Sequence, residues 1–536
     1  MVDARFDRRR FLTMVGGTAV AAGTGGLLSA CNTAESGQPS GPSTAQLPDY
    51  IASELVKPDL PATPEGVMAA YYRYPRTLVD AFSDKPGDGA GEVSIFTNMF
   101  NPVPPGLGGN GYWQELNKRV GAQLNITMTP SADYLNKLST VIAGGDLPDV
   151  MLISARLTKR ADVLTRLCAD LSGLLSGSAV KDFPFLANIP RDSWLSTGYG
   201  SGIYAIPIPR GVAGTIMFSR QDLIRQRGLN PAPGSYQEFL ELATGLTNAK
   251  ANQWAFGHPK GVITFVGNML NVPNVWREEG GAFTSEFETE QRKEAVARVA
   301  EMYRAGLFHP DAMGGKLQLR DLFGNGTLGL TSDGYAAWDI LANTYKVEVG
   351  GIAAPGFSGG EGINRTGTPT FALTAFRKAD PERLRKLLRI CDWLATPLGT
   401  SEYMFRKFGV EGQHYTWRDD VPVRTALGNT EVKLPLEYVA EAPPILGPAE
   451  KARVDAQRAY QEKVVPRMLR NPAEGLYSDT SIDKSGELSK IIDNVELDIV
   501  SGRKPIGAWD EAVAQWRRAG GDQIRAEYVA ARASQG

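Results

Sequence analysis

Two glycine-rich segments of the chain spell patterns that are typical of enzyme sites. Gly106–Gly111 matches GxGxxG, the fingerprint in which backbone N–H groups contact the pyrophosphate of a dinucleotide. That fingerprint needs a strand that runs directly into the glycines, whereas Pro102, Pro104 and Pro105 come just before them. Gly356–Gly360 matches GxSxG, in which a nucleophilic serine lies between a strand and a helix, but no helical pattern follows it. The sequence therefore predicts two irregular loops, without a bound nucleotide or a serine nucleophile.

The residue types that bind metals or transfer protons are present, but not at the spacing of a site. The three histidines, His258, His309 and His414, are scattered, so no His/Cys cluster has zinc spacing. The segment 84–89 (DKPGDG) lacks the acid at the third position of an EF-hand calcium loop and the glutamate that closes such a loop. A glycosidase would need two carboxylates across a cleft; 59 acidic residues leave such a pair open, but no local motif indicates one. We expect no metal and no cofactor.

The amino terminus has the features of an export signal rather than of a folded element. Arg8–Leu12 resembles the twin-arginine signal RRxFL, and Leu28–Cys31 (LSAC) resembles a bacterial lipobox, in which the cysteine thiol is lipidated. An uncleaved anchor helix is the alternative, but the run between these motifs is short and glycine-rich for a span of about 20 apolar residues. We expect a signal peptide over 1–30, lipidation at Cys31 and a body outside the cytoplasm, anchored to the cell membrane.

Two cysteines, Cys168 and Cys391, follow the signal. An exported protein can form a disulfide. Both residues lie among apolar neighbours, and Cys391 falls on the apolar stripe of an expected helix. Two buried free thiols are therefore the favoured interpretation, with pairing as the alternative.

The segment from Ser131 to Ile153 predicts a unit that would position a site. Apolar residues recur at helical spacing from Tyr134 to Ile142, and Gly144-Gly145 ends the helix where a left-handed conformation is needed. After a turn, Val150–Ile153 has the composition of a buried parallel strand. Open parallel sheets bind ligands at the carboxyl ends of their strands, so we expect a ligand close to the end of this one.

Strand and helix patterns alternate along the chain. Strands are expected at 93–97, 124–128, 150–153, 203–209 and 217–218, and helices at 112–120, 235–246, 296–306 and 380–394. The alternation predicts the α/β class with parallel sheets. A chain of 536 residues exceeds one hydrophobic core, so we expect at least two domains. The net charge of −2 gives no basic excess, and we expect no nucleic-acid partner.

Residues 134–150 (YLNKLSTVIAGGDLPDV) resemble a hallmark of extracellular solute-binding proteins, family 1, which carry sugars and oligosaccharides for ABC importers. Later segments agree in the same order. They are Ile203–Pro207, Met217–Glu241, Phe323–Leu330, Phe408–Trp417 and Val500–Asp522. Each match is short, and the shared order across about 93–530 makes the resemblance specific.

The resemblance implies a two-lobed, type II periplasmic-binding-protein-like α/β fold, with discontinuous lobes joined by a hinge. The chain would cross between lobes near 209–213, 367–374 and 435–445. The implied parts are a tether and N-terminal extension (31–91), lobe 1 (92–209 and about 375–437) and lobe 2 (210–374 and about 438–536). Residues 32–58, rich in Ser, Thr, Gly and Pro, are expected to form a disordered tether.

The resemblance also implies a ligand cleft formed by particular loops. A sugar presents apolar C–H faces and hydroxyls, so its site needs aromatic platforms and a few fixed polar groups. The candidates in these loops are Asn98, Ser154, Arg156, Arg210, Trp276, Asp333, Tyr335, Trp338, His414 and Trp417. Alternatives stay open: the aromatic rings could pack in a core, and the arginines could be solvated or ion-paired. Asp333 follows an apolar run, where a charge needs a partner or a ligand.

The function implied is that of a monomeric substrate-binding lipoprotein. It would capture a carbohydrate, with an oligosaccharide favoured, close around it and deliver it intact to the permease subunits of an ABC importer. The alternatives are a secreted enzyme that acts on polysaccharide and a surface scaffold lipoprotein.

Overall fold

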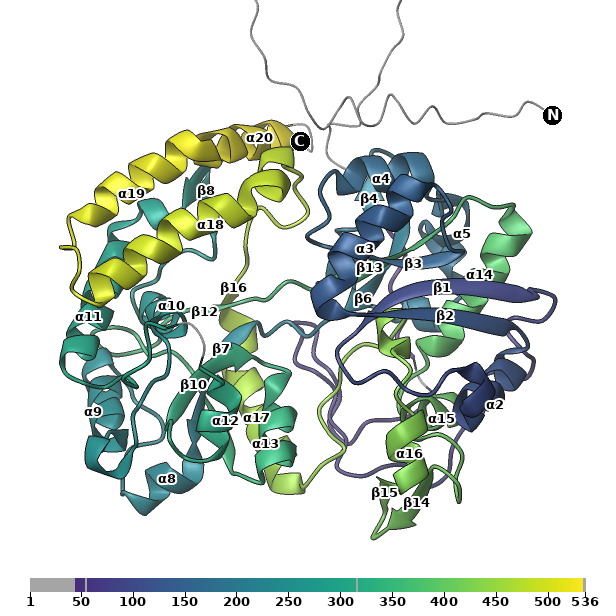
Figure 1. Ribbon diagram of the computed structural model, residues 1–536, viewed down its shortest axis with the longest axis horizontal. Coiled ribbons are helices and arrows are strands. Elements are labelled where there is room, and N and C mark those ends of the chain that lie inside the picture. Colours follow the sequence, from purple (N-terminus) through teal and green to yellow (C-terminus); the bar gives the residue numbers. More distant parts are fainter. Residues whose placement is uncertain (1–43, 54, 315–316, 534–536) are drawn as a thin grey trace, which may run out of the picture. The chain divides into compact units, whose positions relative to one another are not determined.

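The computed structural model describes residues 44–53, 55–314 and 317–533. Helices and strands alternate in it, as the sequence predicted, and they build two α/β assemblies with separate sheets (Figure 1). We call the assembly around the five-stranded sheet, of order β2-β1-β3-β13-β6, the first lobe. The second lobe is built around a three-stranded sheet of order β10-β7-β11.

The first sheet brings several strand ends to one edge. The strands are β1 (Glu92–Met99), β2 (Gln123–Pro130), β3 (Val150–Ser154), β6 (Ala205–Pro209) and β13 (Thr370–Phe376). β1, β2 and β3 pair in parallel, and β13 is antiparallel to both β3 and β6. Four strands therefore end where β13 begins, and we call this side of the sheet the carboxyl edge. This is where parallel sheets place ligands.

Helices cover both faces of the first sheet. They are α2 (Gly111–Val120), α3 (Ser131–Gly144), α4 (Arg160–Leu167), α14 (Pro381–Leu394) and α15 (Ser401–Phe408). α2 and α14 share one core with β1 and β2, while α3 and α4 share the other with β3 and β13. α3 and β3 form the predicted unit: Gly145 ends the helix at a φ of 77°, and the Tyr134 hydroxyl donates to the Leu152 carbonyl at 2.6 Å.

The second sheet corrects the expectation of parallel sheets. β7 (Thr215–Arg220) lies between β10 (Leu330–Gly334) and β11 (Val349–Ile352) and is antiparallel to both. β10 and β11 thus run the same way, joined by α13 (Ala337–Tyr345). The succession of β10, α13 and β11 is a parallel crossover, as the alternating pattern predicts. The pattern does not reveal that β7, which comes earlier in the chain, lies between β10 and β11 in the sheet.

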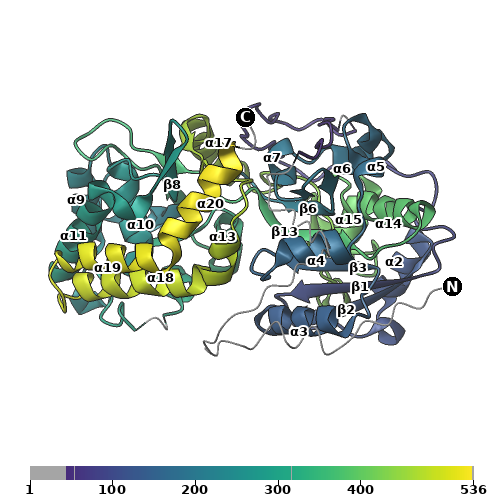
Figure 2. The same cartoon turned by 90° about the horizontal axis from the view of Figure 1, so that it is seen from above.

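Helices from distant parts of the sequence complete the second lobe. They include α9 (Tyr236–Leu246), α10 (Pro259–Met269), α11 (Glu290–Arg304), α17 (Lys451–Val464), α18 (Asp479–Val500), α19 (Ala508–Trp516) and α20 (Asp522–Ala533). α18 packs against α11, α19 and α20 (Figure 2). The carboxyl-terminal residues therefore close a core that begins in the middle of the chain.

Two extended segments connect the lobes side by side. Ala213 and Thr366 form an antiparallel bridge, and a Cβ on Gly214 would come within 2.8 Å of the Gly367 backbone. Glycine is therefore required for this close approach of the two segments. β13 starts directly afterwards at Thr370, so residues 370–374 belong to the first sheet and not to the second lobe, where the sequence-based boundary placed them.

The segment from residue 44 packs on both lobes. Asp49 N–H donates to the Gly177 carbonyl at 3.0 Å, and Leu47 joins a core of the first lobe. Met68 and Ala70 join a core of the second lobe. The expectation of a disordered tether over 32–58 is therefore wrong from residue 44 onward, because an apolar side chain and backbone hydrogen bonds fix this part. The predicted signal peptide and Cys31 lie outside the described residues.

Several smaller predictions have clear outcomes. Cys168 and Cys391 are buried free thiols, as predicted, and burial raises the pKa of Cys168 to about 12. Gly356–Gly360 is a tight loop closed by a hydrogen bond from Gly356 N–H to the Gly360 carbonyl, and Gly106–Gly111 leads through a single 3-10 turn into α2. Both glycine motifs are thus loops, as predicted.

In the described ranges, no group of three or more His, Cys, Asp or Glu side chains is arranged to hold a metal ion. None of the helices described combines the length and the apolar character that crossing a membrane requires.

Candidate functional site

Three aromatic side chains gather at the carboxyl edge of the first sheet. The ring centroids of Phe100 and Tyr438 are 5.2 Å apart, those of Phe371 and Tyr438 are 5.3 Å apart, and those of Phe100 and Phe371 are 6.1 Å apart. Phe100 is 56% exposed, although large apolar side chains are usually buried. We call these three residues the aromatic platform. It offers solvent an apolar surface on which a ligand ring can stack.

The sheet holds the platform in place. Phe100 follows the last residue of β1, and Phe371 is the second residue of β13. Tyr438 ends a short 3-10 helix whose backbone is tied to both strands. The Thr97 hydroxyl donates to the Tyr438 carbonyl at 3.1 Å, and the Thr374 hydroxyl donates to the Val439 carbonyl at 2.6 Å. The platform is therefore fixed by backbone contacts rather than by a free loop.

Arg210 completes one side of the platform. It follows β6, and its backbone N–H donates to the Pro369 carbonyl at 2.9 Å. Its guanidinium lies 4.5 Å from the centre of the Phe371 ring, a cation–π arrangement. Loss of water against the platform lowers the pKa of the guanidinium below its usual value. The guanidinium nevertheless stays charged near neutral pH, since its ordinary pKa is far above neutral.

Polar groups lie at the ends of the neighbouring strands. Asn98, near the end of β1, is 6% exposed, and its Oδ1 has no hydrogen-bond partner among the residues that the structure describes. The Ser154 hydroxyl, at the end of β3, accepts from the Arg156 backbone N–H at 3.2 Å, while the Arg156 residue is exposed. The structure thus brings four of the sequence-predicted residues, Asn98, Ser154, Arg156 and Arg210, to the carboxyl edge. Aromatic faces beside amide, hydroxyl and guanidinium groups suit a polyhydroxylated ligand.

Asp333 is the predicted residue of the second lobe that stays partly accessible. It lies in β10, close to the crossing segment, because the next residue but one, Tyr335, donates its N–H to the Gly214 carbonyl at 2.9 Å. Arg320 donates to both oxygens of its carboxylate, at 2.7 and 3.2 Å. The charge on Asp333 therefore has a partner within the protein, which the sequence pattern did not reveal.

Comparisons with known proteins identify the family. A model of the family described as "Bacterial extracellular solute-binding protein" matches residues 112–398, more than half of the chain. The chain is a bacterial extracellular solute-binding protein. This confirms the resemblance drawn from the sequence.

Relatives of this solute-binding protein support the same conclusion. The polygalacturonan/rhamnogalacturonan-binding protein YtcQ of Bacillus subtilis is 24% identical over 450 residues, covering 77% of this chain and 86% of YtcQ. Lipoprotein LipO of the same organism is 22% identical over 439 residues, covering 76% and 86%. The crystal structure of the alginate-binding protein AlgQ2 without calcium ion matches with a TM-score of 0.57 at 18% identity, covering 85% of this chain and 99% of AlgQ2. The family is one of solute-binding proteins, YtcQ and AlgQ2 are named as binding proteins, and the predicted two-lobed α/β fold is confirmed.

Three predicted aromatic contacts of the solute-binding protein are corrected by their burial. Trp276 is 4% exposed and packs against Trp516 and Tyr528, with ring centroids at 6.1 and 5.6 Å. Tyr335 and Trp338 are 7% and 1% exposed and belong to another core of the second lobe. A ring enclosed in this way has no free face for a sugar. We therefore exclude all three from the proposed site.

Two predicted residues on the segment 408–417 are occupied by contacts within the protein. His414 is 1% exposed; its Nε2 lies 3.2 Å from Glu431 Oε2, and its Nδ1 accepts from the Val410 N–H at 3.0 Å. Trp417 is half-buried, and the Arg76 guanidinium lies 4.1 Å from its ring centre. His414 thus has a structural role, and Trp417 has one face covered.

Sequence reasoning missed the whole aromatic platform. Phe100 lies three residues beyond the expected strand at 93–97, within the region after a strand where parallel sheets place ligand contacts. Phe371 lay within the expected crossing 367–374, and Tyr438 within the crossing 435–445. The three residues could not be grouped from the sequence, since only tertiary contacts join segments so far apart.

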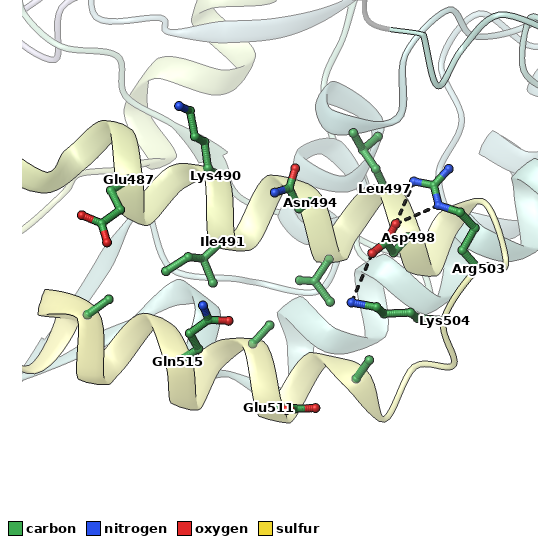
Figure 3. A pocket seen from close by; sticks show the side chains of 14 residues that line it. Glu487, Lys490, Ile491, Asn494, Leu497, Asp498, Arg503, Lys504, Glu511 and Gln515 are labelled. Carbon is green, nitrogen blue, oxygen red and sulfur yellow. Dashed lines mark hydrogen bonds and ion pairs between the residues drawn. The ribbon is translucent and has the colours of Figure 1, made fainter.

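Two hollows of the second lobe lie outside this site. A groove of about 680 Å³ lies between α18 and α19 (Figure 3). Asp498, one of the charged residues that line the groove, is paired with Arg503 at 2.8 Å and with Lys504 at 3.3 Å. A second hollow of about 930 Å³ lies beside β11 and α17. Neither is lined by a residue of the carboxyl edge, and neither presents an exposed aromatic cluster.

Proposed function

We propose that this protein captures an oligosaccharide at the carboxyl edge of the first lobe and delivers it to the permease subunits of an ABC importer. The aromatic platform is the observation that carries the proposal. Phe100 is exposed and Phe371 and Tyr438 are half-buried, and stacking on the C–H face of a sugar supplies a reason for such an accessible aromatic cluster. The names of YtcQ and AlgQ2, which bind polygalacturonan or rhamnogalacturonan and alginate, support a polysaccharide-derived ligand.

The proposed contacts divide between two kinds of group. The platform would hold the apolar face of a sugar ring, and its hydroxyls would bond to Asn98, Ser154 and Arg156. The unpartnered Oδ1 of Asn98 supports this role, because a buried acceptor without a donor costs about 1–3 kcal/mol unless a ligand satisfies it. Asp333 would contribute from the second lobe.

The proposed mechanism is capture by closure. A ligand that contacts both lobes stabilises the closed state by its differential affinity for that state, and the segments 210–214 and 366–369 would serve as the hinge. The closed protein then docks on the permease and releases its ligand chemically unchanged. With residues 370–374 and 438–440 assigned to the first lobe, the other lobe boundaries given above remain part of this proposal.

The proposed setting is the outer face of the cell membrane. A twin-arginine signal would direct export, and lipidated Cys31 would anchor the protein as a monomer. LipO, a relative, is named a lipoprotein, which supports the anchor. Mass spectrometry of the mature amino terminus tests it: a diacylated Cys31 is expected, and an unmodified or uncleaved amino terminus refutes the anchor.

The function is tested by thermal shift and titration calorimetry of the full-length protein against neutral and acidic oligosaccharides. A ligand present at 100 times its dissociation constant should stabilise the fold by about 2.7 kcal/mol. Phe100→Ala should weaken that ligand by up to about tenfold, since an aromatic contact is worth about 0.5–1.5 kcal/mol, without changing stability. Val103→Ala removes an equally exposed apolar side chain nearby and serves as the control.

The outcomes separate the alternatives. Saturable binding of a ligand that is recovered intact supports an importer component. Release of smaller sugars during incubation would instead identify a secreted enzyme that acts on polysaccharide. If an oligosaccharide binds and Phe100→Ala leaves its affinity unchanged, the proposed site is wrong. If no oligosaccharide binds, a scaffold lipoprotein becomes the better interpretation.

A further inference from the structure

Arg210 carries a charge that nothing in the described protein balances. Its guanidinium rests on Phe371, and no carboxylate of the described residues forms an ion pair with it. Arg320 of the second lobe behaves differently, since it binds Asp333 at 2.7 Å. Glu437 precedes Tyr438, whose pKa is raised by burial and by the charge of Glu437, but the described structure has no ion pair between Glu437 and Arg210.

The missing partner has an energetic meaning. One face of the guanidinium has lost water to the Phe371 ring, which is unfavourable for a charge unless an opposite charge or hydrogen bonds compensate. A guanidinium offers a planar fork of N–H donors that matches the two oxygens of a carboxylate. The free face of Arg210 is therefore suited to an anionic group that arrives with the ligand.

The other charged groups of the proposed site also favour an anionic ligand. Arg156, at the end of β3, is a second exposed cation, and its side chain forms no ion pair in the described structure. The single predicted acid, Asp333, is neutralised by Arg320. The proposed contacts therefore carry an uncompensated positive charge.

We infer that the ligand is an acidic oligosaccharide that contains uronate residues, with one sugar ring stacked on the platform and its carboxylate paired with Arg210. A uronate combines an apolar C–H face and a carboxylate in one sugar. Phe100 and Phe371 can bind the C–H face, and Arg210 can bind the carboxylate. This inference rests on the proposed function and specifies its substrate class.

The test compares acids with their own esters. Trigalacturonate and trimannuronate are titrated into the full-length protein beside their fully methyl-esterified forms and a neutral trisaccharide panel. Esterification removes the charge and keeps the ring, so at least one acid should bind tenfold or more tightly than its ester. Added salt should weaken binding of the acid more than binding of the ester.

Variants assign the effect to Arg210. Arg210→Gln should weaken the acid by tenfold or more and change the ester by less than twofold. Arg210→Lys keeps the charge without the fork and should fall between the wild type and Arg210→Gln. Lys118→Gln is the control. Lys118 is exposed near the end of α2, and α2 leads into the amino end of β2, at the edge of the sheet opposite the carboxyl edge. Removing its charge should leave both affinities unchanged.

The results distinguish this inference from the proposed function. If neutral or esterified trisaccharides bind as tightly as the acids, or if Arg210→Gln weakens acid and ester equally, the inference is overturned while oligosaccharide capture stands. If no oligosaccharide binds at all, both proposals fail.

Discussion

Asp392 gives a prediction about stability and pH that can be worked through quantitatively. The side chain lies on α14, is 2% exposed, and one carboxylate oxygen accepts from the backbone N–H groups of Phe185 and Leu186, both at 2.8 Å. Burial raises the pKa of this carboxyl from 3.8 to about 7, although the two N–H donors and the charge of Arg389 oppose that rise. Burial therefore outweighs the favourable contacts.

The sign of the effect follows from proton linkage. Because the pKa is higher in the folded than in the unfolded protein, the folded state binds more protons at pH values between about 4 and about 7. Stability from this group is fully present below pH 4 and is lost as the pH rises through 7. Each pKa unit corresponds to about 1.4 kcal/mol, so the total is about 4 kcal/mol, of which about 2–3 kcal/mol is lost between pH 5 and pH 8.

Urea unfolding at pH 5 and pH 8, followed by circular dichroism, measures this effect in the wild type and in Asp392→Asn. The variant keeps an oxygen acceptor for the two N–H groups but cannot ionise, so its stability should decline by about 2–3 kcal/mol less than that of the wild type. Asp182→Asn is the control, because it alters a 61% exposed carboxylate that pairs with Arg385 of α14. Its stability should depend on pH as that of the wild type does. Equal pH dependence in the wild type and Asp392→Asn would refute the reasoning.

The remaining predictions concern buried groups of the second lobe. Trp276→Ala should destabilise the protein by about 3–5 kcal/mol in urea unfolding, because it opens a cavity among packed rings; a stable variant with weakened sugar binding would return Trp276 to the ligand site. Arg292→Met should cost about 3–5 kcal/mol, since it leaves Glu496, which Arg292 binds at 2.6 Å, as a buried and uncompensated charge. Lys260→Met breaks the exposed pair with Asp493 and should change stability by at most about 1 kcal/mol; equal effects of the two variants would contradict the role assigned to burial.

Predictions based on local patterns were confirmed where the structure depends on residues that are close together in the sequence. The helix and strand between Ser131 and Ser154 form as expected, because helical spacing and a terminal glycine act within a few residues. The burial of both cysteines follows from the apolar residues around them. Local patterns failed for β7, whose insertion between β10 and β11 depends on residues more than a hundred positions later.

The candidate site shows the same division more sharply. Loop position alone predicted that Trp276 faces a ligand, yet its neighbour Val275 adopts a φ of 63° and is 41% exposed, while Trp276 turns into the core. Consecutive side chains of a loop can face different sides, so an assignment that is right for a loop can be wrong for one of its side chains. His414 was misassigned for a related reason, since its partner Glu431 lies on another element.

The sequence by itself determined the family, the α/β class, the order of most elements and the strand ends that carry Asn98, Ser154 and Arg210. These features depend on periodicity, glycine positions and motif order, which the linear chain contains. Only the tertiary structure decided that Phe100, Phe371 and Tyr438 form one platform and that Arg210 rests on it without an anionic partner. Contacts between segments hundreds of residues apart arise when strands pair across the sheet, and no local pattern records which side chains meet there.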